Sequence, residues 1–327
     1  MAFCVCRYND IISLDNLLEA WQEFIRSKRS RKDIQEFEHN LMHNIIFLHD
    51  DLADKTYEHS EYEAFNISDP KPRNIHKAQV RDRLLHHAIY RILYPYFDRQ
   101  FSSSSYSCRL GKGTHRALNQ FRKYSYKASW NHSKTLWILK CDIRKFFASI
   151  DQGVLMEILQ KHIEDKDIIW LLGRILSSFE STVLGKGLPL GNLTSQLLVN
   201  IYMNEFDQFV KHKIKAKYYI RYADDFVTMS TDKVWLEDVL PRFHDFLTSK
   251  LKLSLHPDKV FIKTLASGVD FLGWVHFTDH RVLRSAARRR MFNNLKNNET
   301  EAMMQSYTGL LSHGNSRKLI KKLKEII

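Results

Sequence analysis

The sequence predicts an α+β protein, because strand-like and helix-like stretches follow one another without the regular alternation of an α/β fold. Apolar residues recur at helical spacing in residues 15–54, whereas β-branched and aromatic residues gather at Leu136–Ile143 and Tyr218–Met229. Hydrophobic residues make up 44% of the 327 residues and aromatic residues 12%, which favours a packed globular protein over a disordered one.

The N-terminal region is expected to form two helices. They would be joined by the basic loop Arg26–Lys32, which separates the two apolar runs of residues 15–54. Asp69–Pro72 then marks a break, and a helix-like stretch follows from Arg81 to Tyr94.

The central and C-terminal elements are predicted from the same signals. Leu136–Ile143 is expected to be a buried strand, and Asp151 can cap the helix that follows it. The remaining expected elements are a helix from about Thr194 to Lys213, a hairpin at Tyr218–Met229, a helix at Leu236–Leu251, short strands near 260–262 and 269–277, and a basic helical end from Arg284 onward.

The charge balance favours a polyanionic partner. Fifty basic against 37 acidic side chains give a net charge of +13, which suits nucleic acid, with a membrane surface as the competing partner. The longest uncharged stretch, Gly187–Asn204, is broken by polar residues and is not a credible membrane span. Without signal-peptide features at the N-terminus, a cytoplasmic protein is expected. Reduced thiols and no structural zinc are expected of Cys4, Cys6, Cys108 and Cys141, which form no CxxC pair.

The adjacent carboxylates Asp224 and Asp225 are the strongest chemical signal. They lie between aromatic and β-branched runs, where like charges repel and lose solvation unless a cation is nearby. An ordinary acidic turn is the alternative. If the strand that ends at Asp142 lies beside the hairpin, Asp142 and Asp224 could together bind two Mg²⁺ ions about 3.5–4 Å apart.

The block Asp142–Asp151, followed by Tyr222–Asp225, resembles the palm motifs of reverse transcriptases. Seven blocks occur in the family's order: Lys71–Ile75, Arg81–Arg83, Asp142–Asp151, Gly187–Gln196, Tyr222–Asp225, Leu255–Lys259 and Phe271–Gly273. The resemblance implies a right-hand polymerase fold. Its parts would be an N-terminal helical extension (1–66), fingers (67–134), a palm with part of the fingers interleaved (135–275) and a short helical thumb (276–327).

The resemblance also implies roles for single residues. Metal contacts would come from Asp142, Ile143, Asp224 and Asp225, holding two Mg²⁺ ions with Mn²⁺ as a substitute. Phe147 would lie under the sugar of the incoming nucleotide and exclude a ribose 2′-hydroxyl, which argues for dNTPs. Arg73 would clamp the triphosphate and Lys259 would protonate the departing pyrophosphate, with a solvated surface lysine as the alternative. Arg81 and Arg83 lie near Arg73 in the sequence, and either a salt bridge with Asp82 or a contact with a backbone phosphate would account for them. Phe271–Trp274 resembles the turn that supports the primer end, with core packing of an apolar hairpin as the alternative.

The segment Leu190–Gln196 points to a subfamily. A branched aliphatic residue first and Gln last resembles reverse transcriptases of diversity-generating retroelements, which copy a template RNA with frequent errors opposite adenine. Leu190, Gly191 and Gln196 would then face the incoming dNTP and the nascent base pair. The resemblance implies template RNA, cDNA and an accessory variability determinant as partners, and a bacterial or phage-encoded enzyme.

Two other functions stay open. A retron, group II intron-like or antiphage reverse transcriptase would share the same palm motifs. A non-catalytic RNA-binding scaffold could retain a polymerase palm without using it, although the intact Asp142, Asp224 and Asp225 disfavour this.

Overall fold

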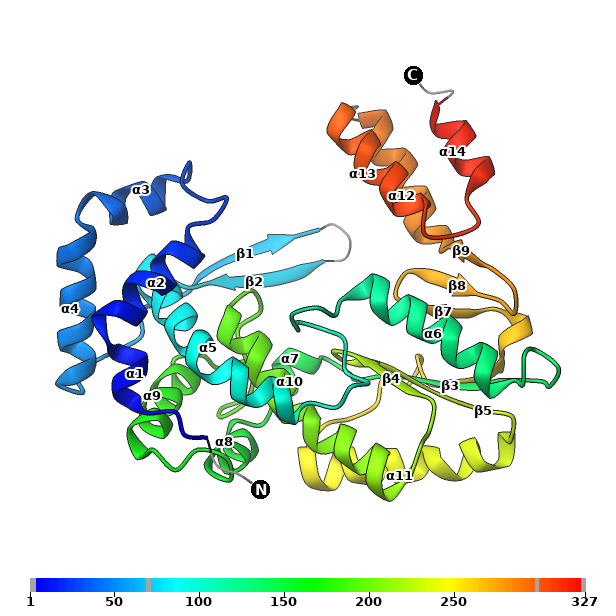
Figure 1. Cartoon of the computed structure of the whole chain (residues 1–327), viewed down its shortest axis with the longest axis horizontal. Helices are drawn as coiled ribbons and strands as arrows, with labels where there is room; N and C mark the ends of the chain where they lie inside the picture. The colour runs from blue at the N-terminus through cyan, green and yellow to red at the C-terminus, as the bar shows by residue number, and fades with distance from the viewer. Residues whose placement is uncertain (1–3, 69–71, 298–299, 325–327) are drawn as a thin grey trace. The chain divides into compact units, whose positions relative to one another are not determined.

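The computed structural model describes residues 4–68, 72–297 and 300–324, and its mixture of helices and antiparallel sheets confirms the predicted α+β class (Figure 1). The chain forms two compact units. Unit 1 comprises Met1–Ser103, Arg144–Phe209 and Phe246–Ser254, and unit 2 comprises Ser104–Ile143, Val210–Asp245 and Leu255–Ile327. Both units are discontinuous in sequence. The division into extension, fingers, palm and thumb is a functional one and stays a prediction.

Unit 1 begins with four short helices where the sequence predicted two. They are α1 (Tyr8–Ile12), α2 (Leu14–Phe24), α3 (Lys32–His39) and α4 (Leu41–Ala53). The Ser13 hydroxyl accepts a hydrogen bond from the Asn16 N–H and so begins α2. Trp21 and Phe24 are buried on its inner face, and the predicted basic loop Arg26–Lys32 lies mostly in the turns between α2 and α3.

The cysteine expectation is wrong at two positions. Cys4 and Cys6 are joined by a disulfide, and their Cα atoms are 5.1 Å apart. A single intervening residue keeps the two Cα atoms within the range that a disulfide requires. Cys108 and Cys141 are free, as expected.

An exposed hairpin follows that the sequence did not predict. Strands β1 (Glu63–Ile67) and β2 (Arg73–Lys77) pair in antiparallel fashion, with Phe65 opposite Ile75. Most of its residues are exposed, so it lacks the apolar alternation by which a half-buried strand is recognised. Residues 69–71, which include Lys71 and most of the predicted break Asp69–Pro72, lie outside the described residues.

Three of the remaining helices described in unit 1 agree with predicted elements, whereas the short helix Phe146–Ser149 and the helix Lys166–Ser177 were not predicted. Asp151 caps α8, because its carboxylate accepts a hydrogen bond from the Val154 N–H at 3.0 Å. The predicted helix near Thr194–Lys213 is α10, which continues as a π-helical turn at Phe209–Lys213. These helices are α5 (Val80–Gln100), α7 (Phe146–Ser149), α8 (Gln152–Gln160), α9 (Lys166–Ser177) and α10 (Leu193–Gln208).

Unit 2 is built on a four-stranded antiparallel sheet with the order β4-β5-β3-β6. The strands are β3 (Trp137–Asp142), β4 (Tyr219–Tyr222), β5 (Asp225–Ser230) and β6 (Phe261–Thr264). Figure 1 shows α6 (Thr114–Ala128) and α11 (Lys233–Leu251) on opposite sides of this sheet. Side chains alternate between the two faces. Val227 therefore joins a core with Phe121 of α6, whereas the ring of Phe226 packs against Phe243 of α11 at 5.9 Å.

A smaller sheet and three helices complete unit 2. Strands β7 (Val269–Phe271), β8 (Trp274–His276) and β9 (Arg281–Leu283) precede α12 (Ser285–Asn297), α13 (Glu301–Leu311) and α14 (Arg317–Lys324). Trp274 packs in a core with residues of these helices. A Cβ at Gly314 would lie 2.0 Å from the Trp274 ring, so glycine is required where the turn after α13 crosses that ring. No helix among the described residues is long and apolar enough to cross a membrane.

Candidate active site

The hairpin β4–β5 positions the two adjacent carboxylates. Ala223 and Asp224 form its turn, and Ala223 adopts a left-handed conformation with φ of 55°. Tight hairpins need positive φ, which is costly for a residue with a Cβ. Arg221 supports this turn, because its Nη1 donates to the Ala223 carbonyl at 3.1 Å and its Nη2 to the Ser105 hydroxyl at 3.1 Å. Arg221 is buried, with 1% of its surface exposed.

The neighbouring strand brings the third carboxylate to the same edge. Asp142 lies directly opposite Asp225 in the antiparallel register of β3 and β5. The Ile143 N–H donates to the Asp224 carbonyl at 3.2 Å, which continues the pairing past the end of β3. All of these residues belong to unit 2. The structure therefore brings together Asp142, Ile143, Asp224 and Asp225, the residues that the sequence assigned to metal binding.

A lysine pairs with Asp225 across the sheet. Lys140 is buried, and its Nζ lies 3.3 Å from Oδ1 of Asp225. It precedes Asp142 by two residues, so both side chains project from one face of β3. Burial raises the pKa of Asp225, the Lys140 charge lowers it, and the Asp142 and Asp224 charges raise it; the net pKa is about 7. Sequence reasoning missed Lys140, although a lysine within the apolar run Trp137–Cys141 was the available signal.

A second lysine pairs with Asp142. Lys259 Nζ donates to Asp142 Oδ1 at 3.0 Å, and 43% of the lysine side chain is exposed. The segment Leu255–Lys259 is held against the end of β3 by backbone hydrogen bonds, since the His256 N–H donates to the Asp142 carbonyl at 2.7 Å. Lys259 therefore lies beside Asp142, one of the three carboxylates. Its role in proton transfer stays a prediction.

The carboxylate edge fits magnesium chemically. Its oxygen atoms are the ligands that Mg²⁺ prefers, and Mg²⁺ is commonly held by one or two carboxylates together with substrate phosphates. Like charges on Asp142 and Asp224 raise the pKa of Asp225, so a bound cation would relieve their repulsion. Within the described parts of the chain, no three His, Cys, Asp or Glu side chains are arranged to enclose one ion. The donor set thus suits an ion shared with a phosphate ligand better than a closed protein cage.

The residues predicted to contact the nucleotide belong to unit 1. Phe147 lies in α7 and is half-buried, and its carbonyl accepts a hydrogen bond from the Leu188 N–H at 2.9 Å. Its ring meets that of Phe146 edge to face, with ring centroids 5.5 Å apart. Phe147 and the segment that leads to Leu190 are therefore linked through the backbone.

Strand β2 is linked to the same segment. The His76 N–H donates to the Leu190 carbonyl at 3.1 Å, and Asn192 returns a side-chain hydrogen bond to the His76 carbonyl at 2.8 Å. Gly191 has φ of 113°, and a Cβ there would lie 2.9 Å from Cγ2 of Ile75. Only glycine therefore allows this close approach.

The other residues predicted to contact the nucleotide, Arg73 and Gln196, lie in unit 1 on elements next to the Leu190 segment in sequence or in hydrogen bonding. Arg73 is exposed at the start of β2, which is linked to Leu190 through the backbone, and Gln196 is half-buried in the first turn of α10. Arg81 and Arg83 form ion pairs within unit 1, Arg81 with Asp51 at 3.1 Å and Arg83 with Asp33 at 2.6 Å. These pairs favour the structural role that the sequence left open for the two arginines.

Comparisons with known proteins agree with this geometry. A family model described as "Reverse transcriptase (RNA-dependent DNA polymerase)" matches residues 68–276, which is nearly two thirds of the chain. Protein YkfC of Escherichia coli K12 is 24% identical over 284 residues, covering 75% of this chain and 72% of YkfC. The group II intron-encoded protein LtrA of Lactococcus lactis is 24% identical over 279 residues, covering 64% of this chain and 44% of LtrA.

Solved structures support the fold alone. Telomerase from Candida albicans, determined with a fragment of telomeric RNA, aligns with a TM-score of 0.52 at 14% identity, covering 82% of this chain and 55% of that chain. Apo telomerase from Candida tropicalis aligns with the same TM-score at 12% identity over 73% of this chain and 52% of that chain. Both are consistent with the predicted polymerase fold. Together with the family match and the carboxylate edge, they lead to one conclusion: this chain belongs to the reverse transcriptases, the RNA-dependent DNA polymerases.

Proposed function

We propose that this chain is the reverse transcriptase of a diversity-generating retroelement, which copies a template RNA into cDNA with frequent errors opposite adenine. The observation that carries the proposal is the Leu190–Gln196 pattern. Most reverse transcriptases have a polar Gln at the position of Leu190. Leu190 has no side-chain donor or acceptor. It therefore offers no hydrogen bond that would favour a correct base pair over a mismatch.

The backbone contacts of unit 1 support a contact role for this segment. Leu190 is tied through its carbonyl to β2, the strand that begins with the predicted triphosphate ligand Arg73. The same segment is tied through Leu188 to Phe147, the residue predicted to lie under the sugar. A half-buried ring at that position would collide with a ribose 2′-hydroxyl and select dNTPs. Sugar choice and base choice would thus be made by residues linked through the backbone.

The carboxylate edge would supply the chemistry. Asp142 and Asp224 would hold two Mg²⁺ ions, with the Ile143 backbone and Asp225 beside them and Mn²⁺ as a substitute. When bound, these ions lower the pKa of an attacking hydroxyl and stabilise charge on departing pyrophosphate. Lys259 has three N–H donors, so it can keep its hydrogen bond to Asp142 and donate another to a phosphate oxygen. Lys140 neutralises Asp225 from within the sheet and leaves the outer carboxylates to the ions.

Template RNA is the proposed principal partner. The net charge of +13 suits a phosphate backbone and predicts affinity that falls steeply with salt. The proposed accessory variability determinant is itself basic, so its docking would depend on local acidic or apolar patches. Co-purification of the two proteins with and without ribonuclease treatment would tell direct contact from tethering through RNA.

The decisive experiment is primer extension on an RNA template with Mg²⁺ and four dNTPs, followed by sequencing of the products. We expect substitutions to concentrate opposite template adenine. Leu190→Gln should lower the error rate at adenine by about tenfold, which corresponds to about 1.4 kcal/mol of discrimination. Leu184→Gln is the matched control, because Leu184 is 81% exposed and has no assigned role. An error spectrum that Leu190→Gln leaves unchanged would contradict the proposal.

A second candidate is a group II intron-like reverse transcriptase. The similarity to LtrA and to the Saccharomyces cerevisiae intron protein encoded in COX1/OXI3 favours it, although the chain spans only 44% and 34% of those proteins. Accurate copying of the RNA template, with no excess of errors at adenine, would support this candidate over the first.

A further inference from the structure

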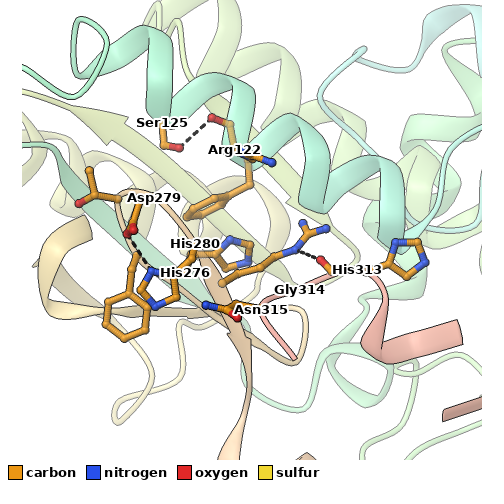
Figure 2. Close-up of a pocket in the computed structure, with 12 residues that line it drawn as sticks. Arg122, Ser125, His276, Asp279, His280, His313, Gly314 and Asn315 are labelled. Atoms are coloured by element: carbon orange, nitrogen blue, oxygen red, sulfur yellow. Dashed lines mark hydrogen bonds and ion pairs between the residues drawn. The ribbon is translucent and has the colours of Figure 1, made fainter. Parts of the chain in front are cut away.

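A cavity of about 190 Å³ lies in unit 2 among residues that play no part in the carboxylate edge. Figure 2 shows the segments that line it: α6 with Arg122 and Ser125, the end of β8 with His276, the following turn with His280, and the turn after α13 with His313. About 10–15 Å³ suffices for one water molecule, so this cavity is far larger than a water site. It has room for an oxyanion of the size of phosphate.

Arg281 lines this cavity and carries an unsatisfied donor. Its Nε donates to the His313 carbonyl, and its Nη2 lies 3.5 Å from Oδ1 of Asn119. Its own carbonyl accepts a hydrogen bond from the Asn315 N–H at 2.8 Å. The remaining nitrogen, Nη1, is buried and has no partner among the described residues. A buried charged donor without an acceptor is costly, so a ligand that supplies one would be bound favourably.

His276 adds a second unsatisfied atom. The side chain lines the cavity, only 3% of the residue is exposed, and Nε2 has no partner within the described parts of the chain. The ring forms a hydrogen bond with the backbone of Phe271. Burial, followed by the charge of Arg281, lowers the pKa of His276 to about 3, so the ring is neutral at pH 7. If the other ring nitrogen donates to Phe271, Nε2 is an acceptor and requires a donor from the ligand.

The charge around the cavity favours an anion. Arg122 and Arg281 lie close enough for the charge of Arg122 to lower the pKa of Arg281, after the larger effect of burial. Neither guanidinium forms an ion pair with a carboxylate in the described structure. Asp279 is the acidic residue of the lining, and its Oδ1 is already bonded to Nδ1 of His280 at 2.7 Å, as Figure 2 shows.

We propose that this cavity binds a phosphate monoester or inorganic phosphate. Arg122 and Arg281 would bind the phosphate oxygens, and Nε2 of His276 would accept a hydrogen bond from the P–OH group that a protonated monoester carries and a diester lacks. A monoester has a second pKa near 6, so a protonated form is accessible near neutral pH. The site is separate from the predicted primer turn: His276 pairs with Val269 at the end of β8 that is remote from Leu272–Gly273. The inference stands whether or not the enzyme is error-prone.

The first test measures stabilisation of the full chain by sodium phosphate in thermal denaturation, with sodium chloride and sodium sulfate at equal ionic strength as comparisons. Specific binding raises Tm in a saturable manner, whereas general screening does not distinguish the anions. We expect saturable stabilisation by phosphate and a weaker response to sulfate, which carries no proton at neutral pH. An equal response to sulfate would overturn the role of His276 as acceptor.

Substitutions test whether phosphate binds at this cavity. Arg122→Gln should weaken the apparent affinity for phosphate about tenfold or more, because charge-assisted hydrogen bonds are the strong ones. Arg122 is exposed and should be dispensable for folding, whereas Arg281→Met also removes contacts of the turn. Lys123→Gln is the matched control, since Lys123 is exposed on the same helix but does not line the cavity. A phosphate effect absent from the wild type, or unchanged in Arg122→Gln, would overturn the proposal.

A second measurement identifies the source of the phosphate. Binding of a short RNA with a 5′-phosphate is compared with binding of the same RNA with a 5′-hydroxyl, in wild type and in Arg122→Gln. A preference for the phosphorylated strand that disappears in the variant identifies a nucleic-acid end as the ligand. Equal affinities, together with saturable binding of inorganic phosphate, identify the free anion.

Discussion

Removal of the Lys140 ammonium tests whether this lysine stabilises the buried carboxylate of Asp225. The two charged atoms are 3.3 Å apart, and the side chains are 10% and 19% exposed. At an effective dielectric constant of about 20, opposite unit charges at this distance attract by about 5 kcal/mol. Desolvation of both groups offsets much of this attraction, whereas removal of one partner from a buried pair costs about 3–5 kcal/mol. Because Asp225 retains some exposure, we expect Lys140→Met to lower the free energy of unfolding by about 3 kcal/mol.

The assay is urea denaturation at pH 8 with EDTA, in a double-mutant cycle that combines Lys140→Met with Asp225→Asn. The double variant should be more stable than the sum of the single effects predicts, by about 2 kcal/mol, because the second substitution removes the charge that the first leaves unpaired. Lys263→Met, at an exposed position of the neighbouring strand β6, should change stability by less than about 0.5 kcal/mol. A coupling energy below about 0.5 kcal/mol would refute the reasoning.

Three further predictions concern the two sites. Asp224→Asn should abolish Mg²⁺-dependent dNTP incorporation while RNA binding measured by filter retention persists; full residual activity would exclude a metal role. Phe147→Ala should raise incorporation of ribonucleotides relative to deoxynucleotides about tenfold or more in single-nucleotide extension, and an unchanged ratio would remove the ring from sugar selection. His276 is buried in its neutral form, and its pKa is lowered to about 3. In the unfolded chain the same ring binds a proton below about pH 6.5, so the folded state loses stability as pH falls from about 6.5 toward 3. In phosphate-free buffer the wild type should therefore lose about 2 kcal/mol more than His276→Phe between pH 8 and pH 5, and equal losses would contradict this account.

The carboxylate edge could be predicted from sequence because its signals are local. Asp142 ends a buried apolar strand, and Asp224 and Asp225 interrupt an aromatic and β-branched hairpin. Two such strands in one sheet have few ways to align once each must bury its apolar face. In the observed register Asp142 lies opposite Asp225, so the strand that ends at Asp142 lies beside the hairpin, as the metal hypothesis assumed.

The residues that support this edge could not be predicted in the same way. Lys140 and Arg221 are charged residues inside buried strands, and nothing near them in sequence identifies their partners. Asp225 becomes the partner of Lys140 only through the pairing of β3 with β5, and the Ala223 carbonyl meets Arg221 only through the shape of the hairpin turn. Sequence alone can therefore identify such buried charges as unusual, but only the fold identifies their partners and so their function.

The residues predicted to contact the nucleotide were harder to place from sequence, for a different reason. Leu190 and Gly191 were identified by resemblance, yet their link to β2 depends on an exposed hairpin without an apolar pattern. Helix α6 (Thr114–Ala128) was also not among the elements predicted from the sequence. The cavity at Arg122 was missed with it, since that cavity needs α6 together with two segments far along the chain.

The discontinuity of the two units has a consequence for biosynthesis. Asp142 and Asp225 face each other across one sheet, but Arg144–Phe209, which belongs to the other unit, is translated between them. At about 5–20 residues per second, a ribosome delivers the two strands many seconds apart. Strand β3 must therefore wait with its buried lysine and apolar residues unpaired, and the nascent chain would depend on chaperones during that interval. The carboxylate edge should therefore form only after the segment Arg144–Phe209 and strand β5 have been translated.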